Sequence, residues 1–281
     1  MGVIRDILRS AIPAEKLRKF SGRFDVIGDI AVITIPSGLE EYEQMIGQAI
    51  MDHRHGIQTV IKKISRITGD SRTATYEIII GTGTETTHYE NGFSYHLDLK
   101  SSFFTPRLAH ERMRVTNQVR AGESVLVLFA GVGPFVIPSA SRGARVVAIE
   151  QNPDACRWLV KNLRKNRVSE QVTVVQGDAF DPVLLADEKF DRAIIPTPYG
   201  RDEIFDLAAA RVGHYGLLHF YTFKNVAQSK EWEHEFENHG YEVISRRRCG
   251  NVAPAVSRWV FDLRRCQASR MRPAIAHISN F

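Results

Sequence analysis

The chain of 281 residues has little cysteine and no long apolar run. Its three cysteines, Cys156, Cys249 and Cys266, lie far apart without CxxC spacing, which argues against a disulfide framework and against a zinc site. No apolar stretch approaches the roughly 18–20 residues that a membrane span needs, and the charged N-terminus lacks a secretory apolar segment. The sequence therefore predicts a cytoplasmic protein with no membrane anchor and no bound metal.

Charge is ordinary in amount but uneven in distribution. The chain has 37 Lys and Arg against 32 Asp and Glu, and 43% of its residues are hydrophobic, which excludes a disordered or fibrous chain. Basic residues concentrate in an N-terminal extension, residues 1–22, and in a C-terminal tail, residues 265–281. Such ends suit contacts with phosphates, as in nucleic-acid enzymes; the alternative is that they only increase solubility.

The next part of the chain, residues 23–99, has the pattern of a small α+β domain for RNA recognition. Asn91-Gly92 between two alternating segments is the strongest hairpin signal of the chain. We expect a strand or kinked strand pair at 24–35, a helix at 39–53, strands at 59–64 and 74–80, and a hairpin of 85–89 with 93–99. These elements predict a mixed or antiparallel sheet.

Residues 100–120 are expected to form a linker helix, and residues 121–264 a second domain with alternating strands and helices. Its expected strands are 124–129, 145–149, 172–175, 190–195, 217–222, 241–248 and 258–263, and its expected helices 153–166, 202–212 and 232–239. Asn152 and Pro153 suit the start of the first of these helices. The pattern predicts an α/β fold, a Rossmann-like doubly wound and mostly parallel sheet.

Three signals follow consecutive strands of this domain. The segment Phe129-Ala-Gly131-Val-Gly133 comes first, then Glu150, then Asp178. Glycines allow close approach of a ligand, an acid after the second strand suits both ribose hydroxyls, and the Asp suits an adenine amino group. Taken singly, these are also packing glycines, a surface Glu and a turn Asp. The third glycine of a dinucleotide motif is absent, which disfavours a nicotinamide dehydrogenase.

In this order the three signals resemble class I S-adenosylmethionine-dependent methyltransferases. A narrower resemblance rests on the segments 25–31, 85–92, 103–108, 129–138, 152–155 and 259–262, and covers about residues 24–264. They are similar to the archaeal and eukaryotic tRNA (guanine-N1)-methyltransferases and the related wyosine-pathway aminocarboxypropyl transferases. The resemblance implies S-adenosyl-L-methionine as cofactor and tRNA as substrate, methylated at N1 of the guanosine 3′ to the anticodon.

The resemblance also implies roles for single residues. Arg107, in Pro-Arg-Leu, matches the arginine that holds the methionyl part of the cofactor, and its presence favours methyl transfer. Glu111 matches the candidate general base for the N1 proton. Arg72 matches the residue that steadies the guanine O6. A base near N1 and a cation near O6 both assist loss of the N1 proton.

The chain departs from the family pattern in the segment after its fourth expected strand. Pro196, Thr197 and Tyr199 occur in Pro-Thr-Pro-Tyr-Gly, where the methyltransferases have Asn-Leu-Pro or Asn-Pro-Pro. Thr197 or Tyr199 is expected to replace the asparagine, by hydrogen bonding or by stacking. Phe103 replaces a tyrosine, and Val127 replaces an aspartate. These changes keep two alternatives open: aminocarboxypropyl transfer to a wyosine precursor, and a tRNA-binding protein without catalysis.

The histidines lack the spacing of metal ligands. His88, His96, His110 and His219 are interpreted as structural residues, and Cys156 as a packing residue on a helix. The expected partner is the anticodon arm of tRNA, bound by a monomer, with an affinity that falls as salt increases.

Overall fold

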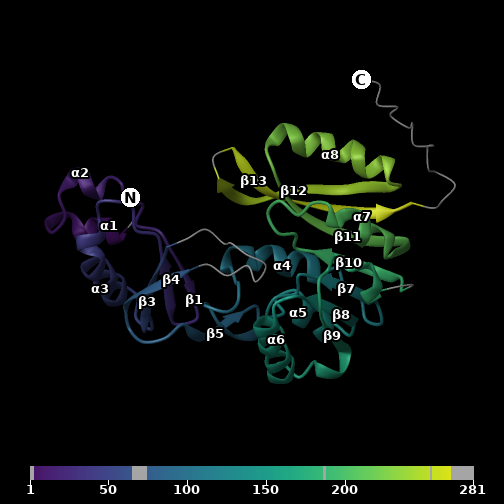
Figure 1. Cartoon of the computed structure of the whole chain (residues 1–281), viewed down its shortest axis with the longest axis horizontal. Helices are drawn as coiled ribbons and strands as arrows, with labels where there is room; N and C mark the ends of the chain where they lie inside the picture. Colours follow the sequence, from purple (N-terminus) through teal and green to yellow (C-terminus); the bar gives the residue numbers. More distant parts are fainter. Residues whose placement is uncertain (1–2, 65–74, 186–187, 254, 267–281) are drawn as a thin grey trace. The chain divides into compact units, whose positions relative to one another are not determined.

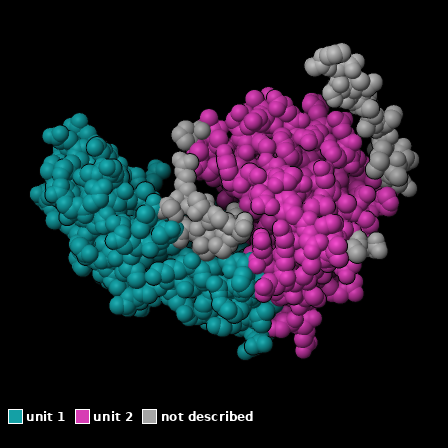
Figure 2. All heavy atoms as spheres, in the orientation of Figure 1, with its two compact units in different colours: residues 1–110, 131–134, 152–167 teal, residues 111–130, 135–151, 168–281 magenta. Residues whose placement is uncertain are grey.

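The computed structural model describes residues 3–64, 75–185, 188–253 and 255–266. The chain divides into two compact units that are discontinuous in sequence (Figure 2). Unit 1 comprises residues 1–110, 131–134 and 152–167, and unit 2 comprises residues 111–130, 135–151 and 168–281. Arg72 lies outside the described residues. Among the described residues, no helix is long and apolar enough to cross a membrane.

Unit 1 contains a four-stranded mixed sheet and a separate hairpin (Figure 1). In the sheet, β2 pairs antiparallel with β1 and parallel with β3, and β3 pairs antiparallel with β4, so the sheet is the mixed one of the two predicted alternatives. The strands are β1 (Phe24–Ile27), β2 (Ile30–Ile33), β3 (Thr59–Lys63), β4 (Tyr76–Ile80), β5 (Glu85–Glu90) and β6 (Phe93–Asp98). The helices are α1 (Val3–Ile7), η1 (Leu8–Ser10), α2 (Ala14–Leu17), η2 (Glu40–Tyr42), α3 (Glu43–His53), η3 (Pro106–Leu108) and α6 (Pro153–Lys165).

The N-terminal segment belongs to the core of unit 1. Ile4, Leu8 and Phe20 are buried in one apolar cluster with Ile46 and Ile50 of α3. The charged residues of the segment mask this apolar periodicity in the sequence, because short helical turns separated by Pro13 do not sustain a long pattern. The segment therefore helps to hold the small domain together, in addition to carrying positive charge.

The outer edge of the hairpin is closed by one side chain of α6 and one at the C-terminal cap of that helix. Asn162 accepts a hydrogen bond from the His96 amide (2.7 Å) and donates one to the His96 carbonyl (3.0 Å). Asn166 makes the same pair of bonds with the backbone of Ser94, at 3.1 and 2.7 Å. The two amides thus satisfy the backbone groups that a neighbouring strand would otherwise pair with.

Unit 2 is built on a seven-stranded sheet in the order β12-β13-β11-β10-β7-β8-β9. Strands β9, β8, β7, β10 and β11 run parallel, whereas β13 pairs antiparallel with both β11 and β12, as expected for an antiparallel edge. The strands are β7 (Ser124–Leu128), β8 (Arg145–Glu150), β9 (Val172–Gln176), β10 (Phe190–Ile195), β11 (Val212–Lys224), β12 (Tyr241–Ala253) and β13 (Val256–Arg265). The predicted Rossmann-like fold is confirmed.

Helical segments of unit 2 are α5 (Val136–Ser141), η4 (Ser169–Gln171), η5 (Pro182–Leu185), α7 (Ile204–Ala210) and α8 (Val226–Asn238), and α4 (Ala109–Thr116) carries the chain from unit 1 into unit 2. Two predicted helices were misplaced. Helix α7 ends at Ala210, two residues before its predicted end, because Val212 already begins β11. Helix α8 begins at Val226, six residues earlier than expected. Its start is a capping box of Asn225 and Gln228 before a polar first turn, which the apolar pattern does not mark.

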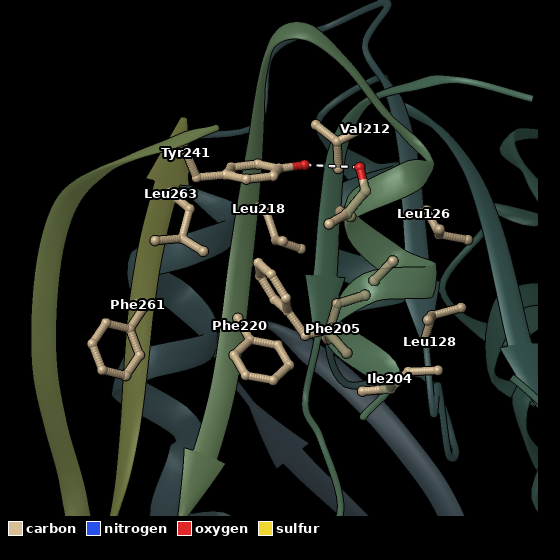
Figure 3. Close-up of a cluster of buried hydrophobic side chains, with 14 of the residues drawn as sticks. Leu126, Leu128, Ile204, Phe205, Val212, Leu218, Phe220, Tyr241, Phe261 and Leu263 are labelled. Atoms are coloured by element: carbon tan, nitrogen blue, oxygen red, sulfur yellow. Dashed lines mark hydrogen bonds between the residues drawn. The ribbon is translucent and has the colours of Figure 1, made fainter. Parts of the chain in front are cut away.

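One face of this sheet is apolar. Phe205 of α7 and Phe236 of α8 pack on Phe220 of β11, with ring centroids 5.3 and 5.9 Å from that of Phe220. Figure 3 shows this cluster, in which the buried Tyr241 hydroxyl donates to the Ala209 carbonyl (2.8 Å). Burial raises the pKa of Tyr241, so its hydroxyl remains a hydrogen-bond donor.

Candidate functional site

The carboxyl ends of β7, β8 and β9 bring together the acids singled out in the sequence. The Ala130 amide donates to the Ile149 carbonyl and the Gly177 amide to the Glu150 carbonyl, each at 3.0 Å. Glu150 and Asp178 therefore lie at the same edge of the parallel sheet, both half-buried. Ligands of open α/β sheets bind at this edge.

The backbone after β7 is unusual. Phe129 has a φ of 52°, a left-handed conformation that bulky residues rarely adopt. Gly131 (φ 56°) and Gly133 (φ 99°) follow at once, and glycine adopts such angles without strain. A non-glycine residue held in this conformation at a strand end is typical of a ligand site.

Aromatic and cationic groups surround Asp178. Its Oδ1 accepts from the Phe180 amide (3.0 Å), and the Phe180 ring lies 6.2 Å from that of Phe129. The Arg201 guanidinium lies 4.2 Å above the Phe180 ring centroid. Phe180 was not predicted as a site residue; its only signal is an aromatic ring two residues after the acid. Together these groups suit a planar heterocycle with an amino group.

In unit 1, Arg107 lies on η3 beside an acidic partner. Its Nε and Nη2 are 2.9 and 2.8 Å from the Asp25 carboxylate, and 68% of its side chain is exposed. Thr105 caps η3 by accepting from the Arg107 amide (3.4 Å), with Pro106 at the first position. The local fold thus presents the guanidinium on the surface of unit 1, where it is available to an anion that replaces Asp25.

Glu111 is the most constrained predicted site residue. It is buried on α4 of unit 2, and Arg114, one turn later, donates to both carboxylate oxygens at 2.6 to 3.0 Å. The Tyr221 hydroxyl of β11 donates to Glu111 Oε1 at 3.2 Å. The Tyr221 ring in turn packs against Phe135, the first residue after the glycine loop, at 5.6 Å between centroids. Glu111 is therefore linked through Tyr221 to the end of that loop.

The Glu111 site continues into a chain of buried charges across the sheet. Arg114 also binds Asp262 of β13, at 2.6 and 3.0 Å, and Asp262 lies 2.6 Å from His219 Nδ1. Arg192 of β10 contacts His219 Nε2 (2.7 Å) and pairs with Glu123 (2.8 Å). Sequence reasoning missed Arg114, Asp262 and Arg192, which the fold brings together from three separate elements.

The contacts of His219 determine its protonation. A guanidinium only donates, so Arg192 donates to Nε2, and the proton of the imidazole sits on Nδ1 and points to Asp262. Burial lowers the pKa of His219 and outweighs the opposing effect of Asp262. The predicted structural role therefore holds, but His219 is also a neutral link between Asp262 and Arg192.

The surroundings of Asp262, Cys249 and Tyr221 determine their protonation in the same way. Burial alone would raise the pKa of Asp262, but hydrogen bonds from His219 and Arg114 outweigh it and hold that pKa well below its usual value. Burial and the Glu111 charge raise the pKa of the Cys249 thiol to about 12, and they raise the pKa of Tyr221 as well. The thiol and the phenol stay protonated, so Tyr221 donates to Glu111 as a neutral group.

The predicted substrate residues lie after β10. Thr197 is buried, and its hydroxyl donates to the Ile195 carbonyl (3.2 Å), so this group is already used within the loop. Tyr199 is exposed and packs on Phe223 of β11. Among the residues that the structure describes, no group of three or more His, Cys, Asp or Glu side chains is placed to hold a metal ion.

Comparison with known proteins matches two family models. The TRM5/TYW2 methyltransferase domain matches residues 86–244, and the TYW2 N-terminal domain matches residues 4–84. Both models together span most of the chain and correspond to the region that carries the sequence resemblance.

Individual relatives fall into two activity classes. The chain is 35% identical to the tRNA (guanine(37)-N(1))-methyltransferase Trm5b of Pyrococcus abyssi over 90% of this chain and 78% of that protein. It is 29% identical to the tRNA(Phe) (4-demethylwyosine(37)-C(7)) aminocarboxypropyltransferase of Pyrococcus horikoshii over 93% of this chain and 95% of that protein.

Solved structures of both kinds of relative are also similar to this chain. The complex of aTrm5 with tRNALeu superposes with a TM-score of 0.84 at 27% identity, over 93% of this chain and 78% of that one. P. horikoshii TYW2 in complex with MeSAdo gives a TM-score of 0.73 at 26% identity, over 93% and 97%. The chain belongs to the TRM5/TYW2 methyltransferase family.

Proposed function

We propose that this protein is an S-adenosyl-L-methionine-dependent tRNA methyltransferase that methylates N1 of the guanosine 3′ to the anticodon. The observation that carries the proposal is the link between Glu111, Tyr221 and Phe135, which ties a buried carboxylate to the glycine loop of a class I methyltransferase fold. We further propose that the enzyme is a cytoplasmic monomer that contacts mainly the anticodon arm.

The residues present fit the cofactor. The Glu150 carboxylate suits the ribose hydroxyls, Asp178 suits the adenine amino group, and the rings of Phe129 and Phe180 suit the faces of the adenine. Gly131 and Gly133 leave room at the backbone, and we assign Arg107 to the carboxylate of the methionyl part, in place of Asp25. When bound, the cofactor supplies an electrophilic methyl group.

The base in this proposal is Glu111. Its Oε1 already accepts from Arg114 and Tyr221, whereas Oε2 accepts a single Arg114 bond of 3.0 Å and faces Arg247 Nε at 4.0 Å. Oε2 is therefore the atom that takes the N1 proton as the N1–methyl bond forms. Arg114 and Asp262 act as positioning residues, because they fix the carboxylate without reaching the substrate themselves. We assign stabilisation of the O6 charge to Arg72.

One observation favours a second candidate, aminocarboxypropyl transfer. Residues 4–84 match the TYW2 N-terminal domain, and the chain is 29% identical to the aminocarboxypropyltransferase of Pyrococcus horikoshii. Arg107 supports methyl transfer in the resemblance described above, whereas the N-terminal match supports the sister activity.

Nucleoside mass spectrometry of an unmodified tRNA transcript, incubated with the protein and S-adenosylmethionine, tests the proposal. We expect 1-methylguanosine at the position 3′ to the anticodon, and its loss in Glu111→Gln. Because positioned acid–base groups contribute about 10²- to 10⁴-fold, the rate should fall by that factor. A control binding assay should show unchanged cofactor affinity in the variant. An aminocarboxypropyl adduct on a wyosine-type tRNA, with none of the methyl product, would contradict the proposal.

A further inference from the structure

The turn after β10 is held rigidly and presents one aromatic ring. The Arg201 amide donates to the Pro198 carbonyl (3.2 Å), and Gly200 supplies the positive φ (73°) that such a turn requires. The turn is fixed to the end of β11 through Asp202, which accepts from Thr222 (2.6 Å) and pairs with Lys224 (2.7 Å). Tyr199 lies in the turn with 65% of its surface exposed.

Tyr199 belongs to a cluster of two tilted rings and a cation. Its ring centroid lies 5.4 Å from that of Phe223, at an interplanar angle of 58°. The Arg258 guanidinium lies 4.9 Å from the Phe223 centroid, and Arg258 is the β13 residue directly paired with Phe223. The cation and the inner ring thus support Tyr199 from the sheet and leave it open to a further planar group.

The cluster lies on the same face of the sheet as Tyr221, the partner of Glu111. Phe223 and Tyr221 are two residues apart on β11, so they face the same side of the sheet, about 7 Å apart along the strand. Tyr221 donates to Glu111, and Arg247, which faces the same side from β12, is half exposed. A planar group on Tyr199 is therefore at the face of the sheet that carries the proposed base and a cation that suits phosphate.

We propose that the Tyr199–Phe223–Arg258 cluster is a nucleobase platform, on which Tyr199 takes a purine of the bound RNA loop that has left its own stack. Exposed aromatic rings with adjacent guanidinium groups bind single-stranded RNA in this way, because every base has a π face. The inference rests on the proposed function and deepens it, because it identifies how the Pro-Thr-Pro-Tyr turn replaces the amide of the related methyltransferases.

The test measures RNA affinity without cofactor, so that it does not depend on methyl transfer. The probes are two tRNA transcripts with 2-aminopurine, one at the guanosine 3′ to the anticodon and one at its 3′ neighbour. Tyr199→Ala should weaken binding by roughly 5- to 150-fold, the range that stacking on one aromatic side chain gives. It should also remove the fluorescence quench of one of the two probes, which identifies the base.

Two variants keep the test specific. Tyr215→Ala removes an equally exposed tyrosine (63%) at the opposite end of β11 and should leave RNA affinity and quench unchanged. Tyr199→Phe should retain both, because it keeps the ring. Equal affinity of Tyr199→Ala and Tyr215→Ala would overturn the platform, as would a Tyr199→Phe variant as weak as Tyr199→Ala. Methyl transfer in the wild type alongside either result would leave the proposed function standing.

Discussion

The two faces of the unit 2 sheet are buried by different means. On β11, Phe220 points to the apolar cluster beneath α7 and α8, whereas its neighbour His219 points to the charged chain beneath α4. The paired residues of β13 repeat the contrast, with Phe261 on the apolar side and Asp262 on the charged side. Alternation along two adjacent strands thus separates an apolar core from a buried polar network.

This difference in how the two faces are buried indicates which face serves the proposed chemistry. Apolar burial contributes about 25 cal/mol per Å² and tolerates exchange of side chains of similar volume. Buried charges lose several kcal/mol of hydration each and recover it only when every partner is in place. The charged face is therefore an inefficient way to stabilise the fold, because it buries Glu111, Arg114, Asp262 and Arg192 together. In the proposed function, this network fixes the Glu111 carboxylate.

The largest expected effect comes from breaking the charged face at its centre. Asp262→Asn removes the negative charge that pairs with Arg114 and replaces one of the two acceptor oxygens with an NH2 donor that faces other donors, and should lower the free energy of unfolding by about 3–5 kcal/mol. It should also lower kcat for methyl transfer, because Arg114 no longer fixes Glu111. Urea unfolding and steady-state kinetics at a temperature where the variant is folded measure the two effects.

The matched control is on the apolar face. Phe236→Ala should lose a similar about 3–5 kcal/mol, since it removes a buried ring, yet kcat of the folded enzyme should not change. If both variants lost kcat equally, the distinction between the two faces would be wrong.

The second effect is a pH dependence at acidic pH that comes from the charged face. Burial lowers the pKa of His219, so the unfolded chain binds its proton at a higher pH than the folded one. The free energy of unfolding should therefore fall as pH decreases below about 6.5, by at most about 1.4 kcal/mol per pH unit from this group. Asp262 acts in the same direction at lower pH, because its pKa is also lowered.

Urea unfolding of the wild type and of His219→Gln between pH 7 and 5 measures this dependence. The variant should be less stable at pH 7 and show a slope smaller by up to one proton. Identical slopes would mean that His219 is not held neutral in the folded state.

The smallest expected effect on stability comes from the cap of α8, a helix on the apolar face. Asn225 caps α8 by accepting from the Gln228 amide (2.8 Å), and Asn225→Ala should reduce stability by about 1 kcal/mol. Thermal unfolding measures the loss, and methyl transfer should be unchanged. A loss of activity in the folded variant would indicate that α8 acts on the site through the sheet.

The sequence predicted the elements that depend on local signals. Asn152 caps α6 as expected, accepting from the Asp154 amide (2.9 Å), and the hairpin around Asn91-Gly92 forms β5 and β6. The seven strands of unit 2 were all located, although β11 and β12 extend well beyond their predicted ends. The C-terminal extensions of both strands pair with β13, whereas the N-terminal extension of β11 begins at Val212, which pairs with Phe190 of β10.

The charged chain could not be predicted in the same way. His219 and Asp262 lie 43 residues apart, and only the antiparallel register of β11 and β13 places them opposite one another. Glu111 was identified by resemblance, and the spacing of Glu111 and Arg114 on one helical face was the single local signal of its partner. From the sequence alone Arg192 would be interpreted as a surface residue, because no residue of its strand indicates a buried acceptor.

Asn162 and Asn166 have a consequence for the order in which the chain folds during synthesis. A two-stranded hairpin is marginal by itself, and the β6 edge is satisfied only when Asn162 and Asn166 arrive. These residues follow His96 by 66 and 70 positions, so the ribosome must translate well into the second unit before the first can be finished. During that interval the open edge is a template for strand pairing with other nascent chains. Synthesis of the methyltransferase-type sheet and protection of the small domain from aggregation are thus coupled in time.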